Sequence, residues 1–372
     1  MEKKIPLIYT LTVTLLFVFL FISGIILARD FLAPVVLAIL FSYLLLPVVN
    51  FLEKHNVHSI LANLISILLL LVILTSIILI MYKNLEALLS DLPTLKAKAN
   101  QNIDQMAGFI EANFGITIQS QKTYLKEGIS NLFAAGGTFT KSIFSATTST
   151  IFKLAVLPVF IFYLLFYRHH IHEFILKAIP ESRRNTINDI VSKISYVTPR
   201  YIGGVFTVVL ILSVLNSIGL YIIGLDHPIV FGIISAIFNF IPYFGTWIGA
   251  IIPFLFALLT GSTPHLALAV IFLFIIIQFI ENNILTPNIT GSYVNLNPLF
   301  TIFSIIVGGM IWGLIGMFVI VPVLAMIKIT FEHFEPLKPY AFLIGNRVHS
   351  KSRWKIWLQK QFTFREKNKG NK

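Results

Sequence analysis

Ten apolar runs divide the sequence, and several of them are long enough to cross a lipid bilayer. A spanning helix needs about 20 consecutive, mostly apolar residues. The chain is 56% hydrophobic and 12% charged, whereas a soluble domain has about 25% charged residues. We therefore predict an all-α polytopic membrane protein rather than a soluble protein with a large core. The runs cover residues 6–27, 31–51, 59–82, 143–167, 201–223, 228–244, 246–260, 264–281, 299–311 and 313–329.

Two pairs of the shorter runs meet at a glycine or a proline. The first pair joins at Pro242–Gly245, and the second joins at Trp312–Gly313. Short segments broken by Gly or Pro at corresponding positions point to a transporter binding site. The pattern fits either re-entrant helical hairpins or tight pairs of full spans. We expect about six full spans and two short hairpins that enter from opposite sides.

Lysine and arginine are distributed unevenly between the runs. The tail from Gly345 onward has nine Lys or Arg and one Glu, and segment 168–200 has six bases and three acids. Segment 83–142 has six bases and five acids in nearly twice that length. Short loops that are rich in Lys and Arg usually face the cytoplasm. We expect a cytoplasmic N-terminus, segment 168–200 and tail, and an extracytoplasmic segment 83–142.

These features divide the chain into four parts. Residues 1–82 form N-terminal membrane helices, 83–142 an amphipathic segment, 143–344 a membrane core with both hairpins, and 345–372 a basic tail. We expect the amphipathic segment to pack on the membrane domain or on a neighbouring subunit of a homo-oligomer. Its helical pattern rests on Leu85, Leu88, Leu89 and Leu92, and on Leu125, Ile129, Leu132 and Phe133.

The basic tail favours a lipid partner over nucleic acid. Lys and Arg clusters beside a membrane helix bind anionic lipid with about 1 kcal/mol per basic residue. Trp354, Trp357 and Leu358 lie among these charges, as in an interfacial amphipathic segment. We therefore expect contact with anionic lipid and no nucleic-acid partner.

The sequence lacks the common signatures of enzymes and metal sites. It has no cysteine, no HExxH zinc pair, no phosphate-binding GxxxxGK[ST] loop and no GxSxG nucleophile elbow. His227 and His265 have no matching acid pair, so we expect them at the outer interface. We predict no cofactor, no metal and no enzymatic activity. A membrane scaffold or sensor remains an alternative to a transporter.

Glu281 is the least expected residue of the membrane core. It ends an apolar run and shares a helix face with Gln278 and Asn282 at spacings of three and four. A carboxylate inside a membrane span is expensive and usually faces the bundle interior or a water-filled cavity. Alternatively, Glu281 only ends the helix at the cytoplasmic interface. The amide-rich segment 282–298 has no Lys or Arg, which favours a functional role.

A second polar set surrounds the first predicted turn. Asn239 would be a buried amide that must find partners. Pro242 frees a backbone carbonyl from its helical bond, and Gly245 lets the chain turn. The second hairpin has corresponding glycines, whose more common role is close helix packing. These are Gly308, Gly309 and Gly313.

Three stretches resemble the autoinducer-2 exporter family. They are LDHPIVFGIISAIFNFIPYFGTWIGAIIP (225–253), ENNILTPNITGSYVNLNPLF (281–300) and VGGMIWGLIGMFVIVPVLAMIK (307–328). One departure is Thr246, where many members have proline, and it would loosen the turn. The matching positions are Asn239, Ile241, Pro242, Tyr243 and Gly245, then Glu281, Asn283, Pro287, Gly291 and Pro298, then Gly308, Gly309, Gly313, Gly316 and Pro322.

The resemblance implies a transporter of the bacterial cytoplasmic membrane. Some members are associated with export of the quorum-sensing signal autoinducer-2. Others are associated with sodium or lithium efflux in exchange for protons. We expect a secondary transporter or facilitator that exports a small solute, with sodium(lithium)/proton antiport as the alternative. A neutral, hydroxyl-rich solute would suit amide partners, and a sodium ion would suit a carboxylate with unwound carbonyls.

We expect one site between the first hairpin and segment 281–291. Glu281 would be the proton- or cation-linked carboxylate, because removal from water favours the protonated form of a carboxyl group. The predicted partners on the substrate or ion path are Asn239, Gln278, Asn282, Asn283 and Asn288. The predicted backbone and hinge positions are Pro242, Gly245, Pro287, Gly291, Gly308, Gly309 and Gly313.

The predicted topology can be tested with single cysteines, because the chain has none. A cysteine that replaces Arg184 is expected to be protected from a membrane-impermeant thiol reagent in intact cells. It should react once the membrane is opened. Strong labelling at this position in intact cells would contradict the topology.

Overall fold

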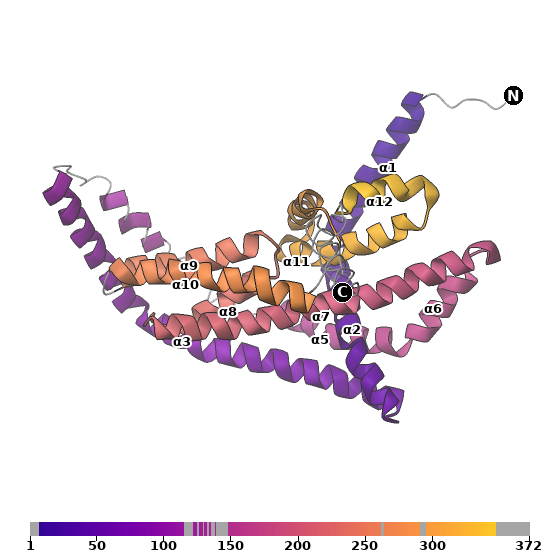
Figure 1. The fold of residues 1–372 in the computed structure, drawn as a ribbon, viewed down its shortest axis with the longest axis horizontal. Helices are drawn as coiled ribbons and strands as arrows, with labels where there is room; N and C mark the ends of the chain where they lie inside the picture. Colours follow the sequence, from indigo (N-terminus) through magenta and orange to yellow (C-terminus); the bar gives the residue numbers. More distant parts are fainter. Residues whose placement is uncertain are drawn as a thin grey trace, which may run out of the picture.

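Helices make up nearly all of the described chain, and the predicted all-α fold class is confirmed (Figure 1). Five helices are long and apolar enough to cross a membrane, and shorter apolar helices accompany them. The described residues form no β-strand, only an isolated bridge between Leu296 and Gly345. The computed structural model describes residues 7–114, 122–124, 126–128, 130–131, 134, 138, 148–261, 264–290 and 295–346.

Six helices correspond to the predicted full spans, and the others form the hairpins or connections. The six are α1 (Leu7–Leu27), α2 (Arg29–Lys54), α3 (Ser59–Phe114), α5 (Thr148–Phe166), α7 (Glu181–Ile222) and α10 (Pro264–Ile280). The others are α6 (Arg168–Lys177), α8 (Pro228–Phe238), α9 (Phe244–Thr260), the π-helix η1 (Glu281–Thr290), α11 (Pro298–Glu332), η2 (Glu335–Leu337) and α12 (Lys338–Ile344).

Helix α3 extends far beyond a membrane span. Its 56 residues measure about 84 Å at 1.5 Å per residue, and it runs unbroken through the predicted boundary at residues 82–83. Ala99 and Ile103 on the extension pack against Leu259. Asn102 donates to the carbonyls of Leu259 and Gly261, each at 2.9 Å. The part of the extension around residues 99–103 therefore packs on the end of α9.

Charged groups attach the same extension to the loop before α8. Lys98 Nζ lies 3.5 Å from the Asp226 carboxylate, and His227 Nε2 lies 3.3 Å from the Asp91 carboxylate. His227 thus contacts an acid that sequence spacing did not suggest. The second predicted amphipathic stretch rests on residues 125, 129, 132 and 133, which lie outside the described residues.

Helices α8 and α9 fold back on each other as the first predicted hairpin. At the tip, the amide of Phe244 donates to the carbonyl of Pro242 at 2.8 Å. Tyr243 between them has φ 67° and ψ −47°, which are the angles of a rare, strained γ-turn. Gly245 is required next, because a Cβ there would collide with the carbonyl oxygen of Phe238.

Helix α11 contains the second predicted hairpin. The backbone leaves the helical region at Trp312 and Gly313, and Gly313 has φ 61°, which glycine adopts readily. Gly308 and Gly316 would be about 12 Å apart along a straight helix. Here a Cβ on Gly308 would lie 2.5 Å from the carbonyl oxygen of Gly316, so the two halves lie side by side. At the tip, the Trp312 indole donates to the carbonyl of Ile25 in α1 at 3.1 Å.

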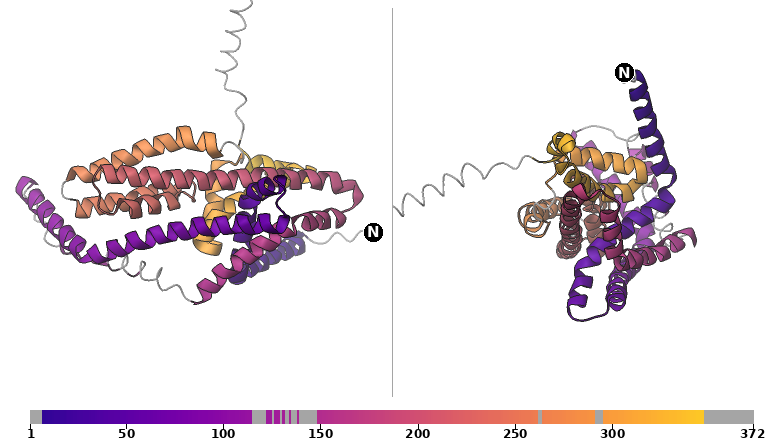
Figure 2. Two further views of the ribbon diagram at one scale, coloured as in Figure 1. Left: turned by 90° about the horizontal axis from the view of Figure 1, so that it is seen from below. Right: turned by 90° about the vertical axis from the view of Figure 1, so that its right-hand side faces the viewer.

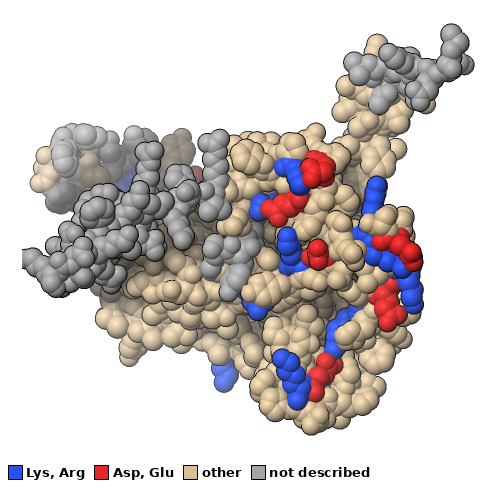
Figure 3. Space-filling model, turned by 45° about the vertical axis from the view of Figure 1, so that its right-hand side comes forward, with Lys and Arg blue, Asp and Glu red and all other residues tan. Residues whose placement is uncertain are grey.

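The two hairpins enter the bundle from opposite ends. The open end of α8 and α9 contacts the α3 extension, and α3 and α7 both run along the long axis (Figure 2). The last turn of α11 lies at the N-terminal half of α7, where Lys193 Nζ is 3.1 Å from His333 Nε2. Charged side chains gather on one side of the molecule (Figure 3), and α6, the start of α7 and the start of α12 contain several charged residues. That this end faces the cytoplasm stays a prediction.

The tail from residue 347 lies outside the described residues. Its contact with anionic lipid therefore stays a prediction. The homo-oligomer also stays a prediction.

We expect Gly245→Ala to destabilise the first hairpin. The new Cβ overlaps backbone rather than a flexible side chain, and overpacking of this kind costs about 1–3 kcal/mol. The apparent melting temperature of the detergent-purified protein should fall by several degrees. Gly24→Ala is the matched control, since a Cβ on Gly24 would meet nothing within 4 Å. Equal melting of both variants would contradict the close approach at Gly245.

Candidate functional site

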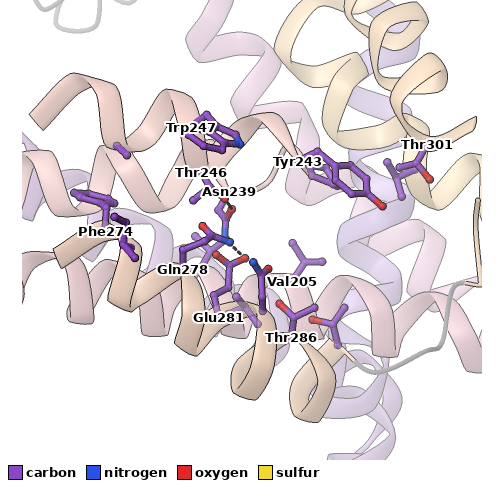
Figure 4. Close-up of a pocket in the computed structure, with 18 of the residues that line it drawn as sticks. Val205, Asn239, Tyr243, Thr246, Trp247, Phe274, Gln278, Glu281, Thr286 and Thr301 are labelled. Atoms are coloured by element: carbon purple, nitrogen blue, oxygen red, sulfur yellow. Dashed lines mark hydrogen bonds between the residues drawn. The ribbon is translucent and has the colours of Figure 1, made fainter. Parts of the chain in front are cut away.

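A cavity of about 870 Å³ lies beside the tip of the first hairpin. Its walls come from α7, the hairpin turn, α9, α10, η1 and α11. This volume is in the range of small-molecule binding sites. Apolar side chains form most of the wall, and polar groups gather around Asn239, Thr246, Gln278 and Glu281 (Figure 4).

A chain of hydrogen bonds crosses from the hairpin to Glu281. Thr246 Oγ1 donates to Asn239 Oδ1 at 3.1 Å, and Asn239 Nδ2 donates to Glu281 Oε1 at 2.8 Å (Figure 4). Gln278, one helical turn before Glu281, also hydrogen-bonds the carboxylate. Because the Thr246 hydroxyl occupies the amide oxygen of Asn239, the amide nitrogen points at the carboxylate. The hairpin tip and α10 are joined through this contact.

The Glu281 carboxylate is buried without a countercharge. The side chain is 9% exposed, and its hydrogen-bond partners are the neutral amides of Asn239 and Gln278. The described residues that line the cavity include no Lys, Arg or His. Neutral hydrogen bonds reduce the desolvation cost of a buried carboxylate, but they do not neutralise it. The Glu281 carboxylate therefore lacks a positive charge that a proton or another cation could supply.

A second cavity of about 10 Å³ adjoins the same residues, because Asn239, Thr246, Gln278 and Glu281 also line it. Asn216, Ser235, Gln278 and Glu281 are among its lining residues. Asn216 is 3% exposed, and neither its Oδ1 atom nor Gln278 Oε1 has a hydrogen-bond partner among the described residues. The volume is close to the minimum that holds one water molecule. Unpaired acceptors around such a space can accept from a water molecule or bind a small cation.

Glu281 begins a π-helix, η1, that continues α10 as far as Thr290. Pro287 within it cannot donate an amide hydrogen bond, and π-helical turns are frequent at functional sites. Gly204 on α7 allows close approach, because a Cβ there would lie 3.0 Å from Cα of Thr290. The sequence suggested unwound carbonyls here only for a sodium site. The segment instead keeps a widened helix, with Glu281 and Thr286 on the cavity wall.

The structure brings together most of the predicted polar site residues and separates two of them. Asn283 is exposed, and its Nδ2 atom donates to the carbonyl of Phe279 at 2.8 Å. Asn288 is also exposed, and neither residue lines the cavity. The predicted residues that do line the cavity are Glu281, Asn239, Gln278 and Asn282.

The predicted backbone positions divide between the two hairpins. Pro242 lines the cavity, and Pro287 lies within η1. Gly245 allows the start of α9 to lie close to the end of α8 in the first hairpin. Gly291 lies outside the described residues. The other three predicted positions belong to the second hairpin and do not line the cavity. They are Gly308, Gly309 and Gly313.

Sequence reasoning missed several residues of this site. Thr246 was expected to loosen the turn, but its hydroxyl instead orients Asn239. Tyr201 on α7 and Tyr243 at the turn also line the cavity. Their roles depend on contacts between helices, so periodicity along one helix could not reveal them. The one available signal was the position of Tyr243 inside the turn motif.

Comparisons with known proteins agree with the earlier resemblance. Residues 15–335 match the family described as AI-2E family transporter. YrrI of Bacillus subtilis (strain 168) is 40% identical over 134 residues, which are 36% of this chain and 37% of YrrI. YueF of the same organism is 31% identical over 192 residues, 51% of each chain. YhhT of Escherichia coli (strain K12) is 21% identical over 330 residues, 87% of this chain and 90% of YhhT.

The chain thus spans about a third to a half of the two Bacillus relatives, and most of the Escherichia relative. The names of all three assign transport provisionally and give no substrate. The family match is the stronger finding because it covers most of the chain, from the first helix to the end of the second hairpin. The chain belongs to the AI-2E family of membrane transporters.

Proposed function

We propose that this protein is a secondary transporter that exports a small organic solute across the bacterial cytoplasmic membrane in exchange for protons at Glu281. The observation that carries the proposal is the buried Glu281 carboxylate, which has neutral partners only. It lies at the junction of a hairpin tip and a π-helix. The membership of a transporter family supports transport in general, and the chemistry at Glu281 supports the exchange.

Exchange follows from the electrostatics of the site. A bare carboxylate in a low-dielectric environment is unfavourable unless a proton or a cation accompanies it. Glu281 can therefore alternate between a protonated state and a state that binds solute. Asn239 and Gln278 keep the carboxyl group in place in both states, because their amides have donor and acceptor atoms. A proton gradient could then drive solute movement through one shared group.

The size of the cavity favours an organic solute over a bare ion. A space of about 870 Å³ can enclose a molecule of many heavy atoms. The largely apolar wall would contact the body of that molecule, and the Asn239–Glu281 group would bind its polar part. In this proposal the charged end of the bundle, around α6 and the start of α7, faces the cytoplasm.

A second candidate is exchange of a monovalent cation for protons. The smaller cavity favours it, because Asn216 Oδ1 and Gln278 Oε1 are unpaired oxygens beside the Glu281 carboxylate. Oxygen ligands and one negative charge suit a dehydrated sodium or lithium ion. A single water molecule would satisfy the same atoms. The flux measurement below separates these candidates.

We expect Glu281→Gln to fold normally and to lose proton-linked transport. The substitution keeps the shape and most hydrogen bonds but removes the exchangeable charge. Pure protein in liposomes that contain a pH-sensitive dye should show which solute or cation gradient it dissipates and how this depends on pH. With Glu281→Gln the rate should fall about tenfold or more, since one lost ionic contact exceeds about 1.4 kcal/mol. The residual rate should not depend on pH, and Glu281→Asp should retain part of the activity.

Asn288→Ala is the control, because Asn288 is exposed and lies outside the cavity wall. It should transport like the wild type. If Glu281→Gln also transports like the wild type with the same pH profile, Glu281 is only a helix end and the proposed function fails.

Thr246→Val tests the orientation of Asn239. Valine keeps the volume but cannot donate to Asn239 Oδ1, so the amide is free to turn away from Glu281. We expect a loss of about fivefold in apparent solute affinity, which corresponds to one hydrogen bond of about 1 kcal/mol. Thr246→Ser should retain wild-type affinity. Equal affinities for the Val and Ser variants would refute this positioning role.

A further inference from the structure

We infer that the substrate is an amphipathic organic monocation, which binds with its charge at Glu281 and its apolar body against the aromatic wall of the cavity. This inference rests on the proposed function and names the substrate class of the same site. It follows from three features of the cavity: the charge of its lining residues, its aromatic side chains, and the lining residues that are exposed on the outside of the helix bundle.

Ionisable side chains give the cavity wall negative charge only. Glu281 is the only acidic residue among the described lining residues, and no Lys, Arg or His lies among them. The other titratable groups that face the cavity are the phenols of Tyr201 on α7 and Tyr243 at the hairpin turn. A phenol ordinarily stays neutral until about pH 10. An ionised Glu281 would therefore repel an anion and attract a cation.

Aromatic side chains line the same cavity as the Glu281 carboxylate. In Figure 4, Phe274 lies to the left of the hydrogen-bonded pair Asn239 and Glu281, Tyr243 lies to the right, and Trp247 lies above Asn239. The faces of such rings attract organic cations, by about 0.5–2 kcal/mol each. A sodium ion in the small cavity would leave this wall unused. A hydroxyl-rich solute would lack hydrogen-bond partners along most of it.

The outer wall of the cavity is exposed on the apolar side of the bundle. Trp247 on α9 is 75% exposed, Ile251 is 50% exposed, and Ile275 on α10 is 60% exposed. These residues line the cavity and also face outward from helices that are apolar enough for a membrane. An amphipathic molecule that partitions into lipid would therefore reach the carboxylate from the side. A strongly hydrated solute would not take this path.

Protons should compete with the organic cation for the Glu281 carboxylate. The cation binds the ionised carboxylate and the proton leaves, so charge is conserved at Glu281. Binding should weaken as the pH falls, because protonated Glu281 has no charge to offer. Tyr201 and Tyr243 should not titrate in this range, which leaves Glu281 as the group among the described lining residues that controls the effect.

Two ions of the same shape and opposite charge provide the test. Binding of tetraphenylphosphonium and of tetraphenylborate to the detergent-purified full chain is measured by equilibrium dialysis from pH 5 to pH 9. We expect saturable binding of the phosphonium and weaker binding at low pH. In weak buffer, each bound cation should release up to one proton at the acidic end of this range and fewer as the pH rises, because less Glu281 is then protonated before binding. Saturable tetraphenylborate binding of equal affinity would overturn the inference.

Four variants separate site binding from partition into the micelle. Glu281→Gln should lower phosphonium affinity about tenfold or more and remove its pH dependence. Trp247→Ala should lower it a few-fold, and Trp247→Phe should restore most of it. Asn288→Ala should bind like the wild type. Unchanged binding by Glu281→Gln would overturn the inference.

Failure of this inference differs from failure of the proposed function. If the phosphonium does not bind, but liposomes show pH-dependent transport of another solute that Glu281→Gln abolishes, the substrate class is wrong and the transport proposal stands. If Glu281→Gln leaves all transport unchanged, both are wrong.

Discussion

The contact between Asn239 and Glu281 is the interaction on which the site depends. It joins the tip of the first hairpin to the end of α10, across 42 positions of sequence. The carboxylate is buried and has only neutral partners, so it is stable only while those partners stay in place. Any movement of the hairpin against α10 would change the solvation of Glu281. Charge state and hairpin position are therefore physically linked.

The surrounding backbone is shaped to permit this contact. The strained turn at Tyr243 reverses the chain within a few residues, and Gly245 lets the following helix pass close to Phe238. On the opposite wall, Gly204 lets η1 pack against α7. Strained turns and π-helical turns persist where the rest of the structure holds them. Both occur here on the walls of one cavity.

Several elements followed from local sequence because their signals are local. Apolar runs of sufficient length predicted the spans, and Gly and Pro predicted the breaks at Pro242–Gly245 and Trp312–Gly313. The spacing of Gln278, Glu281 and Asn282 predicted a shared helix face, because residues three and four positions apart lie on the same side of a helix, and all three line the cavity. Asn283 and Asn288 show that an amide-rich composition does not by itself place a residue in the site. They belong to the same amide-rich segment, but their helix positions turn them outward.

The sequence by itself determined that this is an all-α membrane protein with helix breaks at Pro242–Gly245 and Trp312–Gly313 and a carboxylate, Glu281, at the end of an apolar run, because hydrophobic length and helix-breaking residues act along the chain. Only the tertiary structure decided that Glu281 is buried, which amide meets its carboxylate, that Thr246 orients this amide, and that α3 continues past its apolar run to pack on α9. These features depend on side chains that approach across helices. A hydrogen bond across 42 positions depends on the register of two packed elements, and neither element specifies that register alone.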